Sequence, residues 1–235
     1  MRLFVPIVTD IELGNDLTYL RLMKNICLLD ITIFYINLDC DIEKNAKIKS
    51  TLEKRGFSDV RRIAGTIHEN KKTGVALAHK EALLAGLKTN KPFIVLEDDI
   101  VEYSFRERID VPEDADAYYL GVSIWGLVSG NGKRVISLEP HEEDVYRIYN
   151  MLSAHAILYL NLDYVRFLFK SIDFFIKIET NQDKGRAESM KYWNIYAGKK
   201  PLFAQSDKFY KSTAFDLPGL RWVTPKENFL NQSQL

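Results

Sequence analysis

The apolar residues in the first half of the chain form alternating strand-like and helix-like runs. Residues 31–38 (ITIFYINL) and 93–96 (FIVL) are nearly continuous apolar runs, which are typical of strands buried on both faces of a sheet. Residues 42–55 and 74–87 have apolar positions at helical spacing, and residues 60–64 form a further short strand-like run. The order of strand, helix, strand, helix, strand predicts a parallel sheet with right-handed crossover connections.

Residues at the ends of these segments support their boundaries. Asp41 is in position to cap the helix 42–55, and Gly56 follows its last turn, where glycine commonly ends a helix. A polar loop is predicted at residues 65–73, after which Gly74 opens the second helix. The leucines predicted to form the packed face of that helix are Leu77, Leu83, Leu84 and Leu87.

The remaining segments follow a different pattern. Residues 3–8 suggest an edge strand because they contain Pro6, and residues 17–29 have helical spacing. After residue 99, strands are expected without intervening helices, so the second half is predicted to be mixed. The expected strands there are 117–122, 134–138, part of 145–160 and 201–204, and the expected helices are 164–172 and 187–196. No repeat or linker marks a boundary, so residues 1–235 are predicted to form a single domain.

Three consecutive carboxylates, Glu97, Asp98 and Asp99, directly follow the apolar run at 93–96. Ligands of open α/β sheets bind beyond the carboxyl ends of the strands. Like charges there raise one another's pKa unless a cation is bound, and oxygen ligands suit magnesium, manganese or calcium. A chain of this acidity contains roughly 0.6 acidic triplets by chance, so a solvated or helix-capping role stays open. A second triplet, at residues 142–144, follows no buried strand and is interpreted as a solvent-exposed turn.

Composition excludes several classes of protein. The chain has 46% hydrophobic residues, enough for a sizeable core, and its 32 basic and 32 acidic residues give no signature of nucleic-acid binding. Two cysteines do not build a disulfide framework and suit a reducing compartment. No apolar run approaches the length of about 18 residues needed for a transmembrane helix, and the N-terminus lacks a signal-peptide pattern. We therefore expect a soluble, cytoplasmic protein.

Three motifs together resemble a known family. Residues 36–39 (INLD), 74–79 (GVALAH) and 96–99 (LEDD) have the order and approximate spacing found in glycosyltransferase family 25, the lipooligosaccharide and collagen galactosyltransferase group. The resemblance covers about residues 31–206, which leaves residues 1–30 as an N-terminal addition. The chain departs from the family at Cys40, where arginine is common, and at Ala78, where serine is common. These departures leave the identity of the donor open.

The resemblance implies a fold and an activity. The implied fold is the α/β, GT-A type nucleotide-diphospho-sugar transferase fold, with a Rossmann-like parallel N-terminal half and a mixed-sheet C-terminal half. The implied reaction moves a sugar from a nucleotide-diphosphate donor, a UDP-sugar, to a hydroxyl of a glycan or glycoconjugate acceptor, with inversion. The implied cofactor is Mn²⁺ or Mg²⁺. Glycan or lipopolysaccharide biosynthesis is the corresponding role.

Position in the sequence and the resemblance together assign roles to eight residues. The predicted metal ligands are Asp99, Glu97 and His155; the predicted donor contacts are Asn37, Asp39, His79, Glu97 and Asp98; the predicted catalytic base is Asp183.

Most of these roles have a structural alternative. Asn37 and Asp39 also suit a turn at the end of a strand. His79 and His155 also suit buried, hydrogen-bonded side chains, and Asp183 also suits a carboxylate that interacts with a helix dipole.

Two other functions remain compatible with the sequence. One is a nucleotide-sugar or glycan-binding module that has the fold but no turnover. The other is magnesium-dependent nucleotidyl transfer or phosphate-ester hydrolysis, which also places carboxylates at strand ends. The sequence contains neither the Gly-x-x-x-x-Gly-Lys-Ser/Thr loop nor a strand-end Asp-x-Asp-x-Thr motif, so it gives this second function no specific support.

Overall fold

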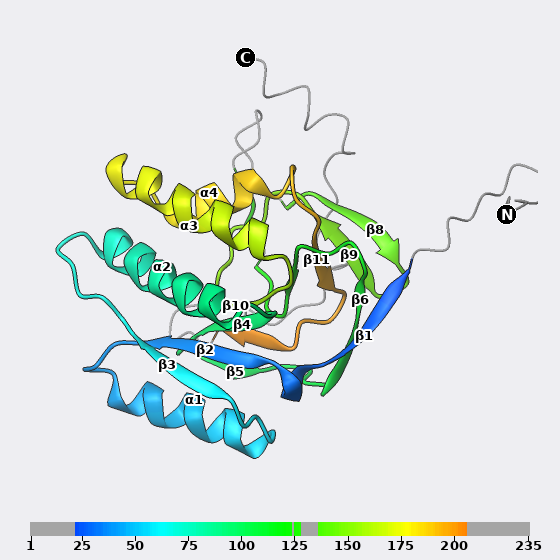
Figure 1. The fold of residues 1–235 in the computed structure, drawn as a ribbon, viewed down its shortest axis with the longest axis horizontal. Coiled ribbons are helices and arrows are strands. Elements are labelled where there is room, and N and C mark those ends of the chain that lie inside the picture. Colours follow the sequence, from blue (N-terminus) through cyan, green and yellow to red (C-terminus); the bar gives the residue numbers. More distant parts are fainter. Residues whose placement is uncertain (1–21, 124, 128–135, 206–235) are drawn as a thin grey trace, which may run out of the picture.

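A computed structural model describes residues 22–123, 125–127 and 136–205 of the chain. The strand predicted at residues 3–8 lies outside these ranges. Within them an eight-stranded mixed sheet has the order β3-β2-β4-β10-β7-β11-β9-β8, and two further strand pairs are β1-β6 and β12-β5 (Figure 1). The strands are β1 (Met23–Cys27), β2 (Thr32–Asn37), β3 (Val60–Ala64), β4 (Phe93–Glu97), β5 (Ile100–Glu102), β6 (Arg108–Pro112), β7 (Ala117–Tyr119), β8 (Leu138–Glu142), β9 (Val145–Ile148), β10 (Ala156–Tyr159), β11 (Ile195–Gly198) and β12 (Phe203–Gln205). The helices are α1 (Ile42–Lys54), α2 (Lys71–Thr89), α3 (Leu162–Lys177) and α4 (Gln182–Ser189), with a 3-10 turn η1 (Leu28–Asp30).

The first half of the sheet is parallel, as the order of the apolar segments predicts. β2 lies between β3 and β4 and pairs in parallel with both, so that Ile36 is opposite Ile63 on one side and Glu97 on the other. The residues of β4 from Phe93 to Leu96 are almost completely buried, which explains their continuous apolar character. The carboxyl ends of these three strands therefore meet at one edge of the sheet.

The second half of the sheet is mixed, which confirms the predicted α/β fold class. β10 is antiparallel to both β4 and β7, whereas β11 is parallel to β7 and antiparallel to β9. The start of β10 therefore reaches the same edge as the end of β4, where the Glu97 amide donates to the His155 carbonyl over 2.9 Å. Strands of both halves thus contribute to one edge of the sheet.

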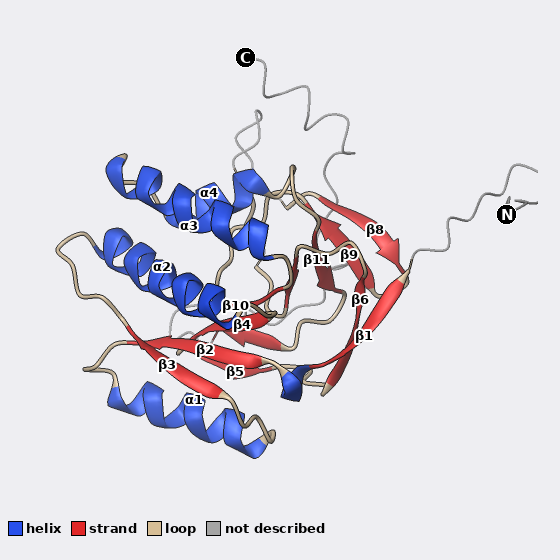
Figure 2. Cartoon of the chain, viewed as in Figure 1, coloured by secondary structure: helices blue, strands red, loops and turns tan. Residues whose placement is uncertain are grey.

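Helices cover both faces of the sheet. Figure 2 shows α1 on one face and the neighbouring helices α2 and α3 on the other. One core cluster joins β2, β4 and β10 to α2 and α3, and a second joins the opposite face to α1 through Ile48 and Leu52. α2 lies close to β4 because it carries small residues there: a Cβ on Gly86 would be 2.2 Å from the Phe93 ring.

The boundaries of α2 differ from the sequence prediction. The helix begins at Lys71 rather than at Gly74, because the Asn70 side chain accepts a hydrogen bond from the Lys72 amide at 3.0 Å and caps the helix earlier. The predicted leucine face is also partly wrong. Leu83 is buried, whereas the other three leucines are half-buried, and alanine and glycine form most of the buried face: Ala76, Ala78, Ala82 and Gly86.

Two predicted helices are wrong in part. Within the predicted helix 17–29, the described residues form β1 and η1, because β1 pairs with β6 from Met23 opposite Pro112 to Cys27 opposite Arg108. This pairing satisfies the backbone groups that a helix would have satisfied internally. In the predicted helix 187–196, α4 ends at Ser189 and Ile195 already belongs to β11, which is inserted between β7 and β9.

The second acidic triplet is the exposed turn that the sequence predicts. Glu142 is the last residue of β8, Glu143 and Asp144 form the turn to β9, and all three are exposed to solvent. The acidic residues of functional interest are therefore those at the end of β4.

Among the described helices, none has the length and apolar character needed to cross a membrane.

Candidate functional site

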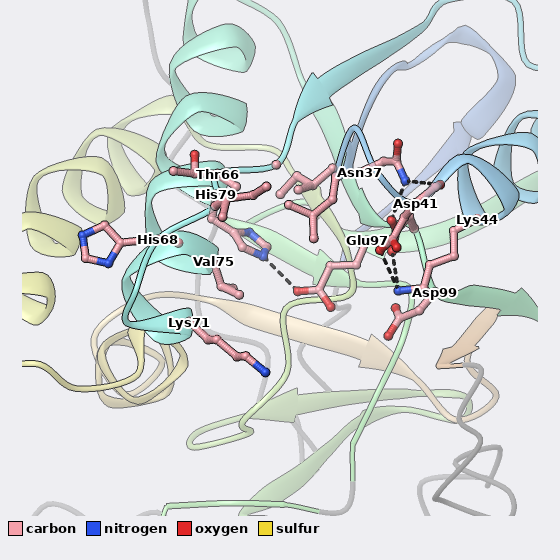
Figure 3. A pocket seen from close by; sticks show the side chains of 17 residues that line it. Asn37, Asp41, Lys44, Thr66, His68, Lys71, Val75, His79, Glu97 and Asp99 are labelled. Atoms are coloured by element: carbon pink, nitrogen blue, oxygen red, sulfur yellow. Dashed lines mark hydrogen bonds and ion pairs between the residues drawn. The ribbon is translucent and has the colours of Figure 1, made fainter.

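A cavity of about 490 Å³ opens at the carboxyl ends of β2, β3 and β4 (Figure 3). Its lining comes from the end of β2 and the start of α1, from the loop between β3 and α2, from the first two turns of α2, and from the acidic triplet after β4. The topology places the cavity where ligands of open α/β sheets bind. We call this cavity the strand-end pocket.

The wall formed by α2 depends on a close contact at Gly74. A Cβ atom at this position would lie 2.5 Å from the Thr66 carbonyl oxygen, so only glycine lets the helix pack this close to the loop that precedes it. Both Thr66 and Gly74 line the pocket. The glycine that the sequence marks as a helix start thus shapes the pocket from inside the first turn.

The three carboxylates of the triplet have different neighbours. Asp98 accepts a hydrogen bond from the Asn37 amide group at 2.7 Å and lies 3.5 Å from the Lys44 ammonium group. Glu97 contacts His79 at 2.9 Å, as Figure 3 shows. The second Glu97 oxygen and Asp99 both accept from the side-chain amide of Gln205, at 3.3 and 3.4 Å. Asp98 is thus held toward α1, whereas Glu97 and Asp99 share a neutral donor.

Gln205 contacts two of the three carboxylates of the triplet, and the predicted set of site residues omits it. It reaches the pocket because β12 pairs with β5, which places Gln205 opposite Ile100, next to the triplet. The contact spans more than a hundred residues, so no local pattern predicts it.

The charges of the pocket favour a cation. Burial raises the pKa of Glu97 to about 7, and burial together with Glu97 and Asp98 raises the pKa of Asp99 to about 7. The Oδ1 atom of Asp99 is buried and has no hydrogen-bond partner within the described residues. The charged side chains that line the pocket are four carboxylates, Asp41, Glu97, Asp98 and Asp99, and two ammonium groups, Lys44 and Lys71. A divalent cation would compensate this excess of negative charge, so the residues fit such an ion.

The two lysines of the pocket differ in their surroundings. Burial disfavours the ammonium form of Lys44, but Asp98 and Asp41 outweigh it and raise the Lys44 pKa. Lys71, in the first turn of α2, is exposed and makes no ion pair with the residues drawn in Figure 3. Lys44 is therefore occupied by carboxylates of the protein, whereas Lys71 is available to an anionic ligand.

His79 lies on the buried face of α2 and is only 1% exposed. Burial, with a contribution from Arg186, lowers its pKa to about 3, so the imidazole is neutral at physiological pH. A neutral ring can donate from Nε2 to the Glu97 carboxylate, which leaves Nδ1 without a partner among the described residues. His79 is therefore the buried, hydrogen-bonded side chain of the structural alternative, and it holds a pocket carboxylate. Its contact with the donor stays a prediction.

Asp39 lies apart from the pocket lining. Its side chain is 79% exposed and pairs with Arg62, and Arg62 also donates to the side-chain and backbone oxygens of Asn37, at 3.0 Å each. Asn37 itself lines the pocket. Of the two residues predicted to contact the nucleotide from the end of β2, Asn37 faces the pocket, whereas the role of Asp39 stays a prediction.

His155 stands at the start of β10, on the same edge of the sheet, but does not line the pocket. Its side chain is 2% exposed, its Nδ1 atom lies 2.9 Å from the Ser153 hydroxyl, and burial lowers its pKa to about 4. The ring packs against Gly121, where a Cβ atom would be 2.1 Å from Nε2. The role of His155 as a metal ligand stays a prediction.

Asp183 lies in the first turn of α4, where its backbone amide donates to the capping side chain of Asn181. Its carboxylate lies 3.8 Å from the Arg186 guanidinium, and a quarter of the side chain is exposed. The pKa of Asp183 is raised, and burial is the largest cause. Arg186 acts in the opposite direction, and Glu97 raises the pKa further. Asp183 does not line the pocket but interacts electrostatically with Glu97 and His79, which do. Its role as catalytic base stays a prediction.

Five predicted site residues thus meet in one pocket: Asn37, His79, Glu97, Asp98 and Asp99. In the parts of the chain that the structure describes, no group of three or more His, Cys, Asp or Glu side chains is arranged to hold a metal ion by itself. This arrangement suits an ion that is held by one or two carboxylates and completed by ligands from the substrate, as magnesium commonly is.

Comparisons with known proteins give no family. No family model matches the chain, and no curated protein matches it. Among solved structures, the chain is similar to a glycosyltransferase involved in the glycosylation of the major capsid of PBCV-1, with 7% identity and a TM-score of 0.37 over 60% of this chain and 65% of the other. The chain therefore spans just under two thirds of the length of that structure.

Two further structures are similar at the same level. One is a nucleoside-diphosphate-sugar pyrophosphorylase from Vibrio cholerae RC9, with 13% identity and a TM-score of 0.40 over 72% of this chain and 73% of the other. The other is the CTP:phosphocholine cytidylyltransferase of Streptococcus pneumoniae, with 12% identity and a TM-score of 0.36 over 88% of this chain and 79% of the other. Similarities at these values assign no activity, so the functional argument depends on the pocket.

Proposed function

We propose that this protein is a metal-dependent glycosyltransferase of the GT-A type, which transfers a sugar from a UDP-sugar to a hydroxyl of a glycan or glycoconjugate acceptor. The observation that carries the proposal is the strand-end pocket, in which the parallel strands β2 and β4 bring Asn37 and the acidic triplet to one wall. The motifs at residues 36–39, 74–79 and 96–99, which carry the family resemblance, all contribute to this pocket. Motifs far apart in the sequence therefore share one place in the fold.

The pocket charges support dependence on Mn²⁺ or Mg²⁺. A donor diphosphate would meet four carboxylates and two ammonium groups, so the uncompensated pocket would repel it. Asp99 and Glu97 are the residues that would hold the ion, because their carboxylates share a neutral amide donor and one Asp99 oxygen has no other partner within the described chain. When bound, the ion neutralises negative charge on the leaving nucleotide.

Other residues of the pocket bind and orient the donor. Asn37, at the end of β2, donates to Asp98, which follows β4, and this pair would contact the nucleoside. Lys71 offers an ammonium group to the phosphates from the start of α2, whose first amides also favour anions. His79 keeps the Glu97 carboxylate in place through its contact at 2.9 Å.

Asp183 is the proposed base that accepts the proton of the acceptor hydroxyl as the oxygen attacks the anomeric carbon. Three observations support this role: a quarter of its side chain is exposed, its pKa is raised, and it interacts with Glu97. His155 has weaker support as a metal ligand, because its ring is buried and Nδ1 already contacts Ser153.

The proposal is tested by thermal unfolding with UDP and UDP-sugars, each with and without manganese. A ligand at about 100 times its dissociation constant adds about 2.7 kcal/mol to the free energy of unfolding, which gives a clear shift. We expect a shift for UDP-sugars that requires manganese and disappears in Asp99→Asn. The matched control is Asp30→Asn, because Asp30 is an exposed carboxylate outside the pocket.

The same samples separate the alternatives. Manganese-dependent binding without release of UDP, in the presence of any acceptor, would favour a binding module. Pyrophosphate release from a nucleoside triphosphate and a sugar phosphate would favour a nucleotidyltransferase. The absence of any stabilisation by nucleotides would refute the proposal.

A further inference from the structure

A buried arginine lies next to the pocket residues and has no role in the mechanism above. Arg186, in the middle of α4, is 2% exposed. One guanidinium nitrogen donates to the Gln182 side chain at 3.0 Å, and another lies 3.8 Å from the Asp183 carboxylate. The Nε and Nη1 atoms have no hydrogen-bond partner within the described residues. A single hydrogen bond is little compensation for a buried guanidinium group.

A buried charge is stable in a fold only when opposite charges compensate it. The carboxylates that interact electrostatically with Arg186 are those of Asp183 and Glu97. The aromatic side chains around it do not supply negative charge, because burial raises the pKa of Tyr119 and Tyr159 and keeps their hydroxyls protonated. Arg186 is thus a positive charge 3.8 Å from a carboxylate of α4, and it also interacts electrostatically with a carboxylate at the end of β4.

We propose that Arg186 is a positioning residue, whose guanidinium group is the shared counter-charge that holds the Asp183 carboxylate next to Glu97. Without this charge, two carboxylates from different elements would face each other in a region of low dielectric constant and would repel. The positive charge lets α4 pack with Asp183 within electrostatic range of Glu97. The inference rests on the proposed function only where it concerns turnover, because the coupling between the charges exists in the protein without ligand.

A double-mutant cycle tests the coupling without any ligand. Arg186→Met should lower the equilibrium constant for folding at least tenfold more in the wild type than in an Asp183→Asn background, because the second substitution removes the uncompensated carboxylate. The cycle with Glu97→Gln should show coupling of the same sign. Asp173→Asn is the control, since Asp173 lies on α3 and pairs with Lys80 of α2, and it should be additive with Arg186→Met. Additivity in the Asp183 or the Glu97 cycle would refute the shared counter-charge.

If Arg186→Met alone does not fold, folding of the double variant with Asp183→Asn supports the coupling. Failure of both variants while Arg186→Lys folds also supports a requirement for the charge. Failure of all three variants would refute the proposal, because the site would then require the shape of arginine rather than its charge.

A second measurement separates positioning from mere stability. With manganese and a UDP-sugar, release of UDP is followed well below the melting temperature of each variant. We expect Arg186→Met to lower kcat at least tenfold with the donor KM within twofold, and Arg186→Lys to restore part of kcat. An unchanged kcat in Arg186→Met would make Arg186 structural only. If the wild type releases no UDP, the proposed function fails, and the ligand-free cycle still decides the coupling.

Discussion

Replacing Glu97 by glutamine should stabilise the protein without ligand, although it removes a proposed metal ligand. Burial holds the Glu97 pKa at about 7, compared with 4.5 for the free side chain, so ionising this carboxylate costs the folded state free energy. A difference of about 2.5 pKa units corresponds to about 3 kcal/mol. Glutamine keeps the shape of the side chain, and its amide can donate to the neutral His79 ring while its oxygen accepts from Gln205.

The sign of this effect depends on pH in a defined way. A carboxylate with a raised folded-state pKa contributes stability that is present below its unfolded pKa of 4.5 and is lost as the pH rises through about 7. Glu97→Gln should therefore match the wild type near pH 4.5 and exceed it by up to about 3 kcal/mol at pH 8. The His155 ring titrates in both proteins and makes no hydrogen bond with the Glu97 side chain, so its contribution cancels in the difference.

Urea denaturation at several pH values, with a chelator present, measures this difference. Glu81→Gln is the matched control, because Glu81 is exposed on α2 and its substitution should change stability by less than about 0.5 kcal/mol at every pH. Equal stability of Glu97→Gln and the wild type at pH 8 would refute the reasoning. A gain of the same size at pH 4.5 and pH 8 would refute it as well, since the cause would then not be the charge.

Three further substitutions test other parts of the site. Asp183→Asn should leave the manganese-dependent thermal shift with UDP-sugar unchanged and lower turnover by about 10²-fold, the usual scale for a general base. Wild-type turnover would show that Asp183 only interacts with the dipole of α4. If the His155 ring is a metal ligand, His155→Ala should weaken manganese binding more than it lowers the stability of the apo protein. If manganese affinity stays at the wild-type value and the free energy of unfolding in urea falls by about 1–3 kcal/mol, His155 is a packing residue. Gly74→Ala should weaken UDP binding by calorimetry, because its Cβ would push the Thr66 carbonyl at 2.5 Å; unchanged affinity would show that the loop moves without altering the pocket.

The parallel half of the sheet was predictable because its residues obey strong local rules. β2 and β4 are buried on both faces and therefore need nearly continuous apolar runs, and Gly56 follows the first helix, where the sequence predicts its end. The same reasoning predicted Asn37 and the acidic triplet as neighbours, because parallel strands bring their carboxyl ends together.

The parts that the sequence did not predict depend on long-range pairing. β6 carries Ile109 and Val111 inward and charged residues outward, a weak alternation over five residues that became a strand by pairing with β1. Gln205 and Arg186 approach the pocket through strand pairing and helix packing, and no local pattern marks either of them as a neighbour of Glu97. Local periodicity predicts elements, whereas these contacts are decided by topology.

The contact between Gln205 and Glu97 has a consequence for the order of assembly. The strands β2, β3 and β4 come from one continuous segment, whereas Gln205 follows Glu97 by 108 residues. At about 5–20 residues per second, a ribosome takes about 5–20 s to synthesise that interval. The parallel strands can therefore pair while Glu97 and Asp99 are still without their amide donor, and water solvates both carboxylates in that period. Burial of the two acids is then a late step of folding, completed when β12 joins β5.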